Sequence, residues 1–217
     1  MSDFATRRTM MVDTQVRPSD VTKYPIIDAM LSVPRENFVP TGLRETAYMG
    51  ENIDLDGGRV VLEPRTLAKM LDALDIGPDE LVLDVACGYG YSSAVIARMA
   101  QAVVALEEDE NMAREAQEAL MDAGADNVVV HEGRLTEGAQ EHGPYDVLVV
   151  QGAVAQLPDA LISQLKDGGR AAALFMDGAL GEVRVGYKMD GRMTWRAAFN
   201  AGAPILPGFE KHHKFEL

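Results

Sequence analysis

A regular alternation of short apolar runs with helical segments constrains this chain more than any other feature of its sequence. Five apolar runs follow one another between residues 81 and 175, and turn-forming residues bound each of them. Apolar runs that alternate with helices predict βαβ units, whose strands lie parallel in one sheet. The expected strands are Leu81–Val85, Ala102–Leu106, Val128–Val130, Tyr145–Val150 and Ala171–Phe175. The expected helices between them are Ser92–Ala100, Glu110–Ala123 and Ala160–Leu165.

The last third of the chain adds an antiparallel element. Segments Glu182–Met189 and Met193–Phe199 flank the dipeptide Asp190-Gly191. An Asp-Gly pair between two such segments is a strong signal for a two-residue hairpin turn. Five parallel strands and this hairpin predict an α/β fold with a seven-stranded, Rossmann-like sheet.

The first sixty residues follow a different pattern. Apolar residues recur at helical spacing in Met10–Val16 and Ile26–Val33, and prolines interrupt them, which predicts short helices joined by loops. Residues 50–59 are interpreted as a loop, and Pro64 as the first residue of a helix that ends near Leu74. We therefore expect a single domain over residues 1–217, in which residues 1–60 form a helical cover and residues 61–217 the Rossmann-like core.

Composition excludes several classes of protein. No apolar run reaches the roughly 18 residues needed to cross a bilayer. No apolar signal core follows the N-terminus, and the single cysteine, Cys87, permits no intramolecular disulfide, so a cytoplasmic location is expected. The formal net charge of −14 repels a phosphate backbone, so neither nucleic acid nor a membrane is expected as a partner.

A glycine-rich turn follows the first predicted strand and opens a helix. The sequence Asp84-Val85-Ala86-Cys87-Gly88-Tyr89-Gly90-Tyr91 lacks the third glycine of a dinucleotide fingerprint. Gly88 and Gly90 allow a tight turn and a close approach of the backbone to a ligand, and a Cβ at Gly90 is expected to collide with that ligand more than with the fold. A carboxylate at Asp84 opposes a pyrophosphate but suits the cationic methionine end of S-adenosylmethionine.

The second predicted strand ends in an acid. Glu107 is the first residue after the apolar run, where it could accept hydrogen bonds from both hydroxyls of a ribose. A solvated carboxylate is the alternative for Glu107, as a purely structural turn is for the glycines. The predicted binding residues for S-adenosylmethionine are Asp84, Ala86, Cys87, Gly88, Gly90, Tyr91 and Glu107.

Beyond these residues, longer segments resemble the protein-L-isoaspartate O-methyltransferases. The specific part is N-terminal: Met11–Pro18 (MVDTQVRP) and Ala29–Pro40 (AMLSVPRENFVP), followed by the pair Ala47-Tyr48. Further on, Pro144–Val150 resembles the fourth strand of this family, and Leu161–Arg170 resembles its "L-x-x-Q-L-K-x-G-G-R" signature.

The resemblance implies a seven-stranded methyltransferase sheet and an S-adenosylmethionine-dependent enzyme. Its expected activity is methyl transfer to the carboxylate of L-isoaspartyl residues in damaged proteins, a protein-repair reaction. A protein or peptide that carries isoaspartate is then the expected partner. An ionised carboxylate is already a nucleophile, so positioning and desolvation matter more than a strong base.

The acceptor side departs from the family pattern at three places. Leu62 stands where the "I-S-x-P" element has a hydroxyl residue, Gly133-Arg134-Leu135 replaces "G-D-G", and residues 152–155 read Gly-Ala-Val-Ala instead of "A-A-A-P". Glu63 as a replacement base and Arg134 as a clamp for an acceptor carboxylate are candidates, although an exposed glutamate and a surface arginine are the simpler interpretations. We therefore expect weak or altered activity on isoaspartate.

Metal chemistry is not expected from the sequence. His212-His213 stands alone between two lysines, and His131 and His142 are interpreted as structural or solvent-facing. Cys87 is interpreted as a small packing residue, because no base is located beside it.

Other functions remain open on the residues alone. They are a methyltransferase with a different acceptor, a non-catalytic module that binds S-adenosylmethionine, and a nicotinamide-dependent oxidoreductase. The missing third glycine and the acid at Asp84 argue against the last of these.

Overall fold

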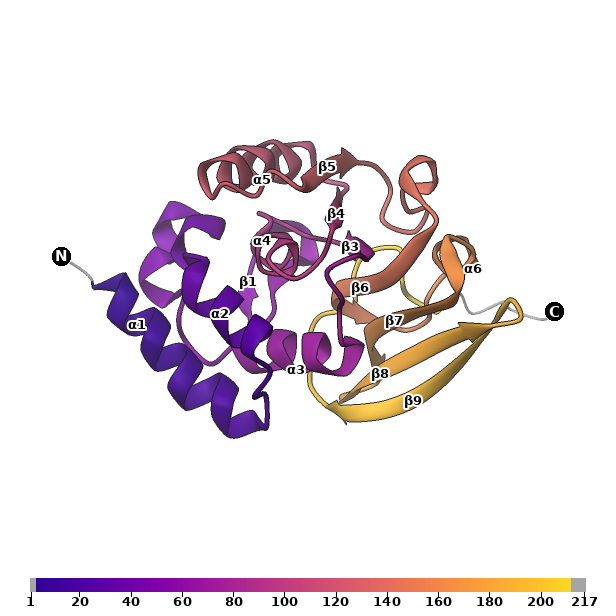
Figure 1. Cartoon of the computed structure of the whole chain (residues 1–217), viewed down its shortest axis with the longest axis horizontal. Coiled ribbons are helices and arrows are strands. Elements are labelled where there is room, and N and C mark those ends of the chain that lie inside the picture. The colour runs from indigo at the N-terminus through magenta and orange to yellow at the C-terminus, as the bar shows by residue number, and fades with distance from the viewer. Residues whose placement is uncertain (1–2, 212–217) are drawn as a thin grey trace.

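A computed structural model describes residues 3–211 and confirms the predicted sheet (Figure 1). Seven strands lie in the order β5-β4-β3-β6-β7-β8-β9. The first five strands in this order are parallel to one another, and β8 pairs antiparallel with both β7 and β9. At the hairpin turn, Asp190 and Gly191 both have positive φ, as a two-residue turn of this class requires. The strands are β3 (Leu81–Val85), β4 (Ala102–Glu107), β5 (Val128–Glu132), β6 (Tyr145–Val154), β7 (Leu165–Asp177), β8 (Leu180–Met189) and β9 (Arg192–Asn200).

The two faces of the sheet are covered differently. Helices α3 (Pro64–Leu74), α4 (Tyr91–Ala97) and α5 (Glu110–Asp122) pack with one core cluster, which contains Val82 of β3. Leu83, the next residue, belongs to the cluster on the opposite face. That face is covered by the short helix α6 (Asp159–Ser163), by the segment between β5 and β6, and by Leu206 and Phe209.

Two boundaries differ from the prediction because β7 begins earlier than expected. Gly168-Gly169 was expected to close a helix, but α6 ends at Ser163 and both glycines lie within β7. A Cβ at Gly169 would stand 2.9 Å from the carbonyl oxygen of Lys166, so the glycine permits a close backbone approach inside the strand.

The N-terminal cover is helical, as predicted, and packs beside α3 and α4 (Figure 1). Its elements are α1 (Phe4–Met11), the π-helical η1 (Val12–Val16), η2 (Arg17–Ser19), α2 (Tyr24–Ser32), η3 (Arg35–Phe38) and η4 (Thr41–Thr46). Residues 50–59, predicted as a loop, instead contain β1 (Ile53–Asp54) and η5 (Asp56–Gly58), and β1 pairs with β2 (Val60–Val61). We call residues 53–61 the covering hairpin.

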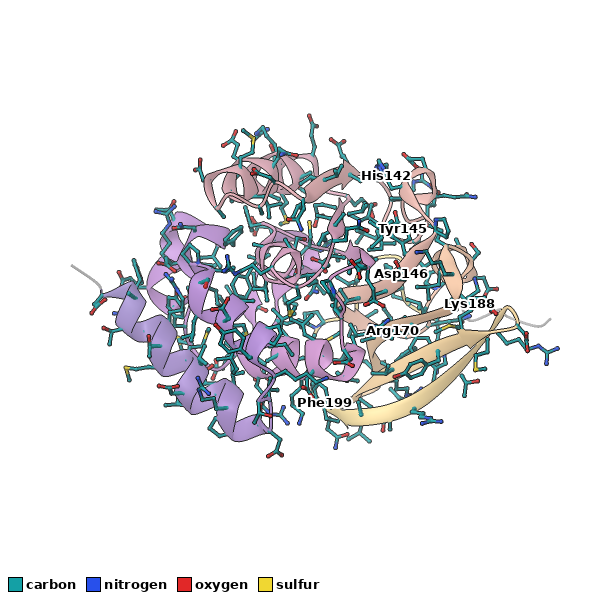
Figure 2. All side chains as sticks on the ribbon, viewed as in Figure 1. His142, Tyr145, Asp146, Arg170, Lys188 and Phe199 are labelled. Atoms are coloured by element: carbon teal, nitrogen blue, oxygen red, sulfur yellow. The ribbon has the colours of Figure 1, made fainter. Side chains whose placement is uncertain are left out.

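Charged side chains tie α3 to the far half of the sheet. Arg170 of β7, labelled in Figure 2, pairs with Glu80 at 2.7 Å and donates to the carbonyl oxygen of Asp75, just after α3. Near the carboxyl end of β9, the ring centroid of Phe199 lies 5.2 Å from the ammonium of Lys69, which belongs to α3. The antiparallel extension of the sheet is therefore fixed to the same helix that the covering hairpin precedes.

No helix among residues 3–211 is long and apolar enough to span a membrane.

A buried arginine joins the cover to the core. Arg35 is fully buried, donates from Nε to the carbonyl oxygen of Ala47 at 2.7 Å and from Nη2 to that of Leu62 at 2.8 Å. Its guanidinium also lies 4.6 Å from the ring centroid of Tyr91 on α4. One side chain thus connects three segments, and we propose that cover and core form one cooperative unit.

The variant Arg35→Ala tests this proposal. It leaves two buried carbonyl oxygens without a donor and opens a void, so the free energy of unfolding should fall by about 2–4 kcal/mol. Urea unfolding followed by far-UV circular dichroism and by the fluorescence of Trp195 should give one coincident, shifted transition. The exposed Arg44→Ala is the control and should unfold like the parent. Two separate transitions in the parent chain would contradict a single unit.

Candidate active site

The glycine turn lies at the carboxyl ends of β3 and β4, where parallel sheets bind ligands. The amides of Ala86 and Cys87 donate to the carbonyl oxygen of Leu106 at 2.9 and 3.1 Å, which fixes the turn against β4. Ala86, Gly88 and Gly90 all have left-handed φ values of 69°, 57° and 89°. For Ala86 this conformation is uncommon, so the turn is held by its surroundings rather than by residue preference.

A side chain at either glycine would meet protein atoms. A Cβ at Gly88 would stand 3.1 Å from Leu55 of the covering hairpin, and a Cβ at Gly90 would stand 3.1 Å from Leu120 of α5. A Cβ at Gly90 would therefore press on the fold itself, while the expected collision with a ligand stays a prediction. Gly90 is needed where the turn packs against α5.

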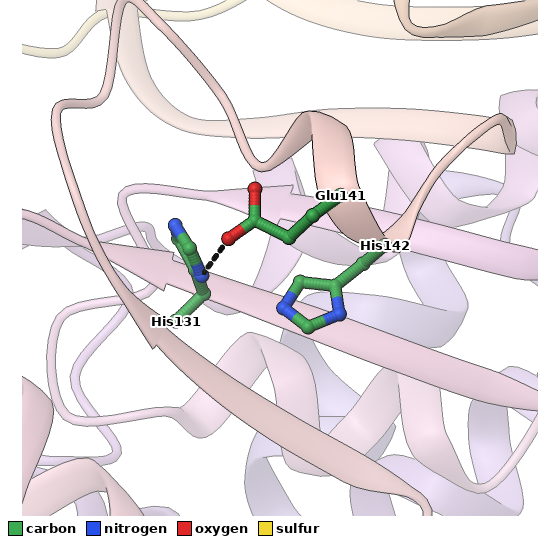
Figure 3. A group of neighbouring side chains, drawn as sticks. All are labelled: His131, Glu141 and His142. Atoms are coloured by element: carbon green, nitrogen blue, oxygen red, sulfur yellow. Dashed lines mark ion pairs between the residues drawn. The ribbon is translucent and has the colours of Figure 1, made fainter.

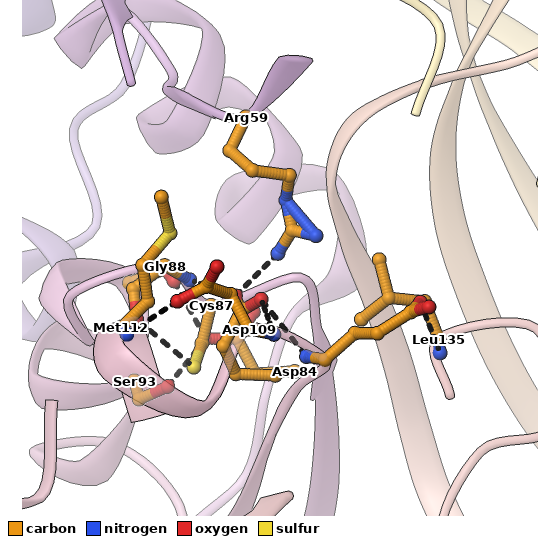
Figure 4. A network of polar contacts seen from close by, with 11 residues as sticks. Arg59, Asp84, Cys87, Gly88, Ser93, Asp109, Met112 and Leu135 are labelled. Carbon is orange, nitrogen blue, oxygen red and sulfur yellow. Dashed lines mark hydrogen bonds and ion pairs between the residues drawn. The ribbon is translucent and has the colours of Figure 1, made fainter. Parts of the chain in front are cut away.

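Glu107 is buried in a network of polar contacts, in which Figure 4 labels Arg59, Gly88 and Asp109. Its Oε1 accepts from the amides of Glu108 at 2.8 Å and Asp109 at 3.0 Å. Its Oε2 accepts from the amide of Gly88 at 2.8 Å and from Nη2 of Arg59. Burial raises the pKa of Glu107, and the Arg59 guanidinium opposes this effect. The interpretation of Glu107 as a solvated carboxylate is excluded by these contacts.

Arg59 belongs to the candidate site, although the sequence did not predict it. It comes from the covering hairpin, is 5% exposed, and supplies the cation for Glu107. Its Nε is buried without a hydrogen-bond partner. An unpartnered buried donor costs about 1–3 kcal/mol, so the contact between Arg59 and Glu107 is less stable than a fully satisfied ion pair. The dipeptide Gly57-Gly58 before Arg59 was the available signal, because it permits a sharp turn toward the core.

Asp84 is buried and fully bonded inside the protein. One carboxylate oxygen accepts from the hydroxyls of Ser92 and Ser93 at 2.6 Å each, and the other accepts from the amide of Gln151 at 2.7 Å. Burial raises the pKa of Asp84 to about 6, and these three hydrogen bonds oppose the rise. The carboxylate therefore connects β3, α4 and β6 to one another. The approach of Asp84 to a ligand stays a prediction.

Leu62 and Glu63 are adjacent in sequence but lie in different surroundings. Leu62 is 1% exposed and lines a cavity of about 10 Å³ together with Cys87 and Gln151. Glu63 precedes α3, and its carboxylate accepts from the hydroxyl of Thr66 at 2.6 Å. Leu62 therefore lies beside the glycine turn, whereas the carboxylate of Glu63 binds to the first turn of α3.

The other acceptor-side candidates are not brought to the turn. The side chain of Arg134 is 74% exposed and pairs with Glu137 at 3.3 Å, in agreement with the simpler interpretation. Residues 152–155 are covered by the chain's own tail, since a Cβ at Gly152 would stand 2.7 Å from Leu206. The amide of Ala155 also donates to the carbonyl oxygen of Phe209 at 2.9 Å.

Cys87 and Tyr91 belong to the packing of the turn. Cys87 is buried, and burial raises the pKa of its thiol, which agrees with a packing residue rather than a nucleophile. The ring of Tyr91 lies against Arg35 and at 6.1 Å from Phe38, so its side chain packs against the cover.

The fold also brings His131 and His142 together, a pairing that the sequence did not predict. Their ring centroids are 5.3 Å apart, and Glu141 lies beside them. His212 and His213 lie outside the described residues.

The raised pKa of Asp84 leads to a prediction about stability and pH. The pKa of Asp84 is near 3.8 in the unfolded chain and about 6 in the folded protein. At a pH between these two values, unfolding therefore releases a proton. Stability should therefore fall as pH rises from about 4 to 6 and stay lowered above that, by about 2–3 kcal/mol. Asp84→Asn should remove this part of the pH dependence, as measured by urea unfolding at pH 4.5 and 7.5. The exposed Asp79→Asn is the control, and parallel behaviour of the parent and Asp84→Asn would refute the raised pKa.

Comparison with known proteins identifies the family. The family model described as protein-L-isoaspartate(D-aspartate) O-methyltransferase matches residues 6–176. Protein-L-isoaspartate O-methyltransferase 2 of Pelobacter propionicus is 38% identical over 164 residues, which cover 76% of this chain and 73% of the relative. The corresponding enzyme of Koribacter versatilis is 33% identical over 193 residues, covering 89% and 87% of the two chains.

Solved structures show the same fold. One named protein-L-isoaspartate O-methyltransferase superposes with a TM-score of 0.79 at 22% identity and covers 94% of this chain and 66% of its own. A Plasmodium falciparum structure in complex with S-adenosyl-L-homocysteine also has a TM-score of 0.79, at 17% identity, and covers 95% and 99% of the two chains. With a family model that spans most of its length and relatives above 30% identity, this chain belongs to the protein-L-isoaspartate(D-aspartate) O-methyltransferase family.

Proposed function

We propose that this chain transfers a methyl group from S-adenosylmethionine to the free carboxylate of L-isoaspartyl residues in proteins or peptides, in the cytoplasm. The observation that carries the proposal is the position of Glu107. This buried carboxylate lies at the end of β4 and accepts a hydrogen bond from the amide of Gly88 in the glycine turn. Its position fits a cofactor site of the kind that the family requires. The reaction is a methyl transfer onto oxygen, as the family name states.

The chemistry of the site fits the adenosine part of the cofactor. Glu107 can accept hydrogen bonds from ribose hydroxyls if Arg59 releases it, because its other contacts are backbone amides that can stay in place. Leu55 of the covering hairpin lies over Gly88, where the same ligand would approach the backbone. We infer that the covering hairpin moves away from Glu107 and Gly88 when the cofactor binds.

Asp84 is then a positioning residue. S-adenosylmethionine, when bound, supplies an electrophilic methyl group on a sulfonium. Through Ser92, Ser93 and Gln151, Asp84 fixes the start of α4 and the end of β6 beside the turn. Its charge is close enough to the turn to favour a cation there, without direct contact.

The acceptor peptide needs an open surface at the same edge of the sheet. A cavity of about 790 Å³ lies at the carboxyl end of β7, which is two strands from β3. Arg184 lines it, half-exposed, with its guanidinium 4.9 Å from the ring centroid of Phe175. We propose that this cavity takes the peptide and that Arg184 attracts the acceptor carboxylate.

Binding of S-adenosyl-L-homocysteine tests the role of Glu107. Glu107→Gln removes a charged acceptor of ribose hydroxyls, so affinity should fall by about 1.5–3 kcal/mol, or roughly 10- to 150-fold in Kd. Titration calorimetry measures this loss directly. The exposed Glu110→Gln is the matched control. Equal affinities of the two variants would remove Glu107 from the site.

Methylation of an isoaspartyl peptide tests the acceptor, with the normal aspartyl peptide as its control substrate. Leu62 offers no hydrogen bond, and the loss of one donor from transition-state stabilisation slows an enzyme by about 10²–10³-fold. The parent chain should therefore be slower than the typical enzyme rate of about 10 per second. Leu62→Ser should raise turnover on the isoaspartyl peptide and leave cofactor affinity unchanged.

The matched control for this gain is Leu62→Ala. It opens the same buried space without supplying a hydroxyl, and each variant should lose about 2–5 kcal/mol of stability. Equal turnover in the serine and alanine variants would show that space, rather than a hydrogen bond, limits the reaction. A parent chain that already turns over at the typical rate would contradict the proposed weak activity.

A further inference from the structure

Three side chains with metal-binding atoms meet away from the glycine turn. Among the residues that the structure describes, His131, Glu141 and His142 form a group whose ligand atoms all lie within 4.8 Å of one another (Figure 3). Nδ1 of His131 is 3.5 Å from Oε1 of Glu141, and the ring of His142 stands edge-on to that of His131. Two imidazoles and one carboxylate are a donor set that Zn²⁺ accepts, with a further position left for water.

The separation of the first two ligand atoms already suits one shared ion. Zn–N and Zn–O bonds of about 2.0–2.2 Å at a tetrahedral angle place two ligand atoms about 3.3–3.5 Å apart. The third ligand comes from His142, whose exposed side chain can approach by a rotation of its ring. We expect the binding of an ion to need a rotamer adjustment of His142.

The direction of the His131 side chain is set by strand β5 and by the space that Gly133 leaves. Val128 and Val130 of β5 pack toward α5, so Val129 and His131 face the side of the sheet that no long helix covers. A Cβ at Gly133 would stand 2.9 Å from Nε2 of His131. The missing side chain at Gly133 leaves room for the imidazole, and the opposite nitrogen, Nδ1, faces Glu141.

The segment that carries the other two ligands is anchored independently. Glu141 and His142 lie in η6 (Gln140–His142), directly after the buried Ala139. The amide of Ala139 donates to Oε1 of Gln164 at 3.0 Å, and its carbonyl oxygen accepts from the hydroxyl of Tyr145 at 2.5 Å. Ligands on a segment with fixed backbone lose little entropy when a metal binds, which favours affinity.

We propose that His131, Glu141 and His142 form a binding site for a divalent transition-metal ion of the zinc type. The ion would join η6 to the uncovered face of β5 and so fix the connection between β5 and β6, which contains no α-helix. Nitrogen ligands favour Zn²⁺ over Mg²⁺, which prefers oxygen atoms and retains its water molecules. This site is separate from the proposed cofactor site and does not depend on it.

Titration calorimetry of the full chain, freed of metal by a chelator and then of the chelator, tests the site with ZnCl₂. One ion per chain should bind, and MgCl₂ at the same concentration should give no saturable heat. His131→Gln and His142→Gln should each weaken zinc binding at least tenfold, and the double variant should abolish it. Glu141→Gln should weaken it too, because the neutral amide is a poor ligand.

The matched control is the double variant His212→Gln/His213→Gln, which removes the same number of histidines from the tail. It should bind zinc like the parent. Thermal unfolding gives a second readout: zinc at about 100 times its Kd should raise the Tm of the parent and of the tail variant by roughly 5–10 °C. The His131→Gln/His142→Gln variant should show no such rise while retaining the Tm of the metal-free parent.

Two outcomes would overturn the proposal. One is the absence of saturable zinc binding with one ion per chain in the parent. The other is loss of binding in the tail variant with binding retained in His131→Gln/His142→Gln, which would place the ion on His212 and His213. Because every readout uses the metal alone, failure of the proposed methyl transfer would not affect the result.

Discussion

The buried carboxylate of Glu107 is the anion around which the rest of the site is built. Four hydrogen bonds reach it from three parts of the chain: the glycine turn, the residues that follow β4, and the covering hairpin. A buried charge is costly unless it is paired and bonded, so each of these segments is held in a position that satisfies it. The conformation of the turn and the closure of the hairpin therefore share one electrostatic cause.

A second buried carboxylate organises the neighbouring strand by different means. Asp84 has neutral donors as its hydrogen-bond partners, and the nearby charge of Glu107 contributes to its raised pKa. Two carboxylates at adjacent strand ends thus have unlike environments, one paired with a guanidinium and one with hydroxyls and an amide. Family membership makes the chain an O-methyltransferase, and this pair gives the proposed cofactor site a defined electrostatic asymmetry.

Much of this architecture could be predicted from the sequence because its signals are local. The strands follow from apolar runs, the hairpin from Asp190-Gly191, and the importance of Glu107 from its place at the end of a strand. The partners of these residues could not be predicted in the same way. Arg59 reaches Glu107 across 48 residues and Gln151 reaches Asp84 across 67, and such contacts depend on how the elements pack. His131 and His142 meet only because the segment between them folds back over β5.

The sheet ends in a strand that is poorly suited to accept another. Along β9 the arginines Arg192 and Arg196 are exposed, and the pairing with β8 shifts between Val183 and Arg184, which leaves an extra residue on the outer strand. Such a bulge bends and twists an edge, and a second copy brought alongside would face like charges. The outermost strand of this sheet therefore resists edge-to-edge pairing, so a chain with a long antiparallel extension can remain free of β-aggregation.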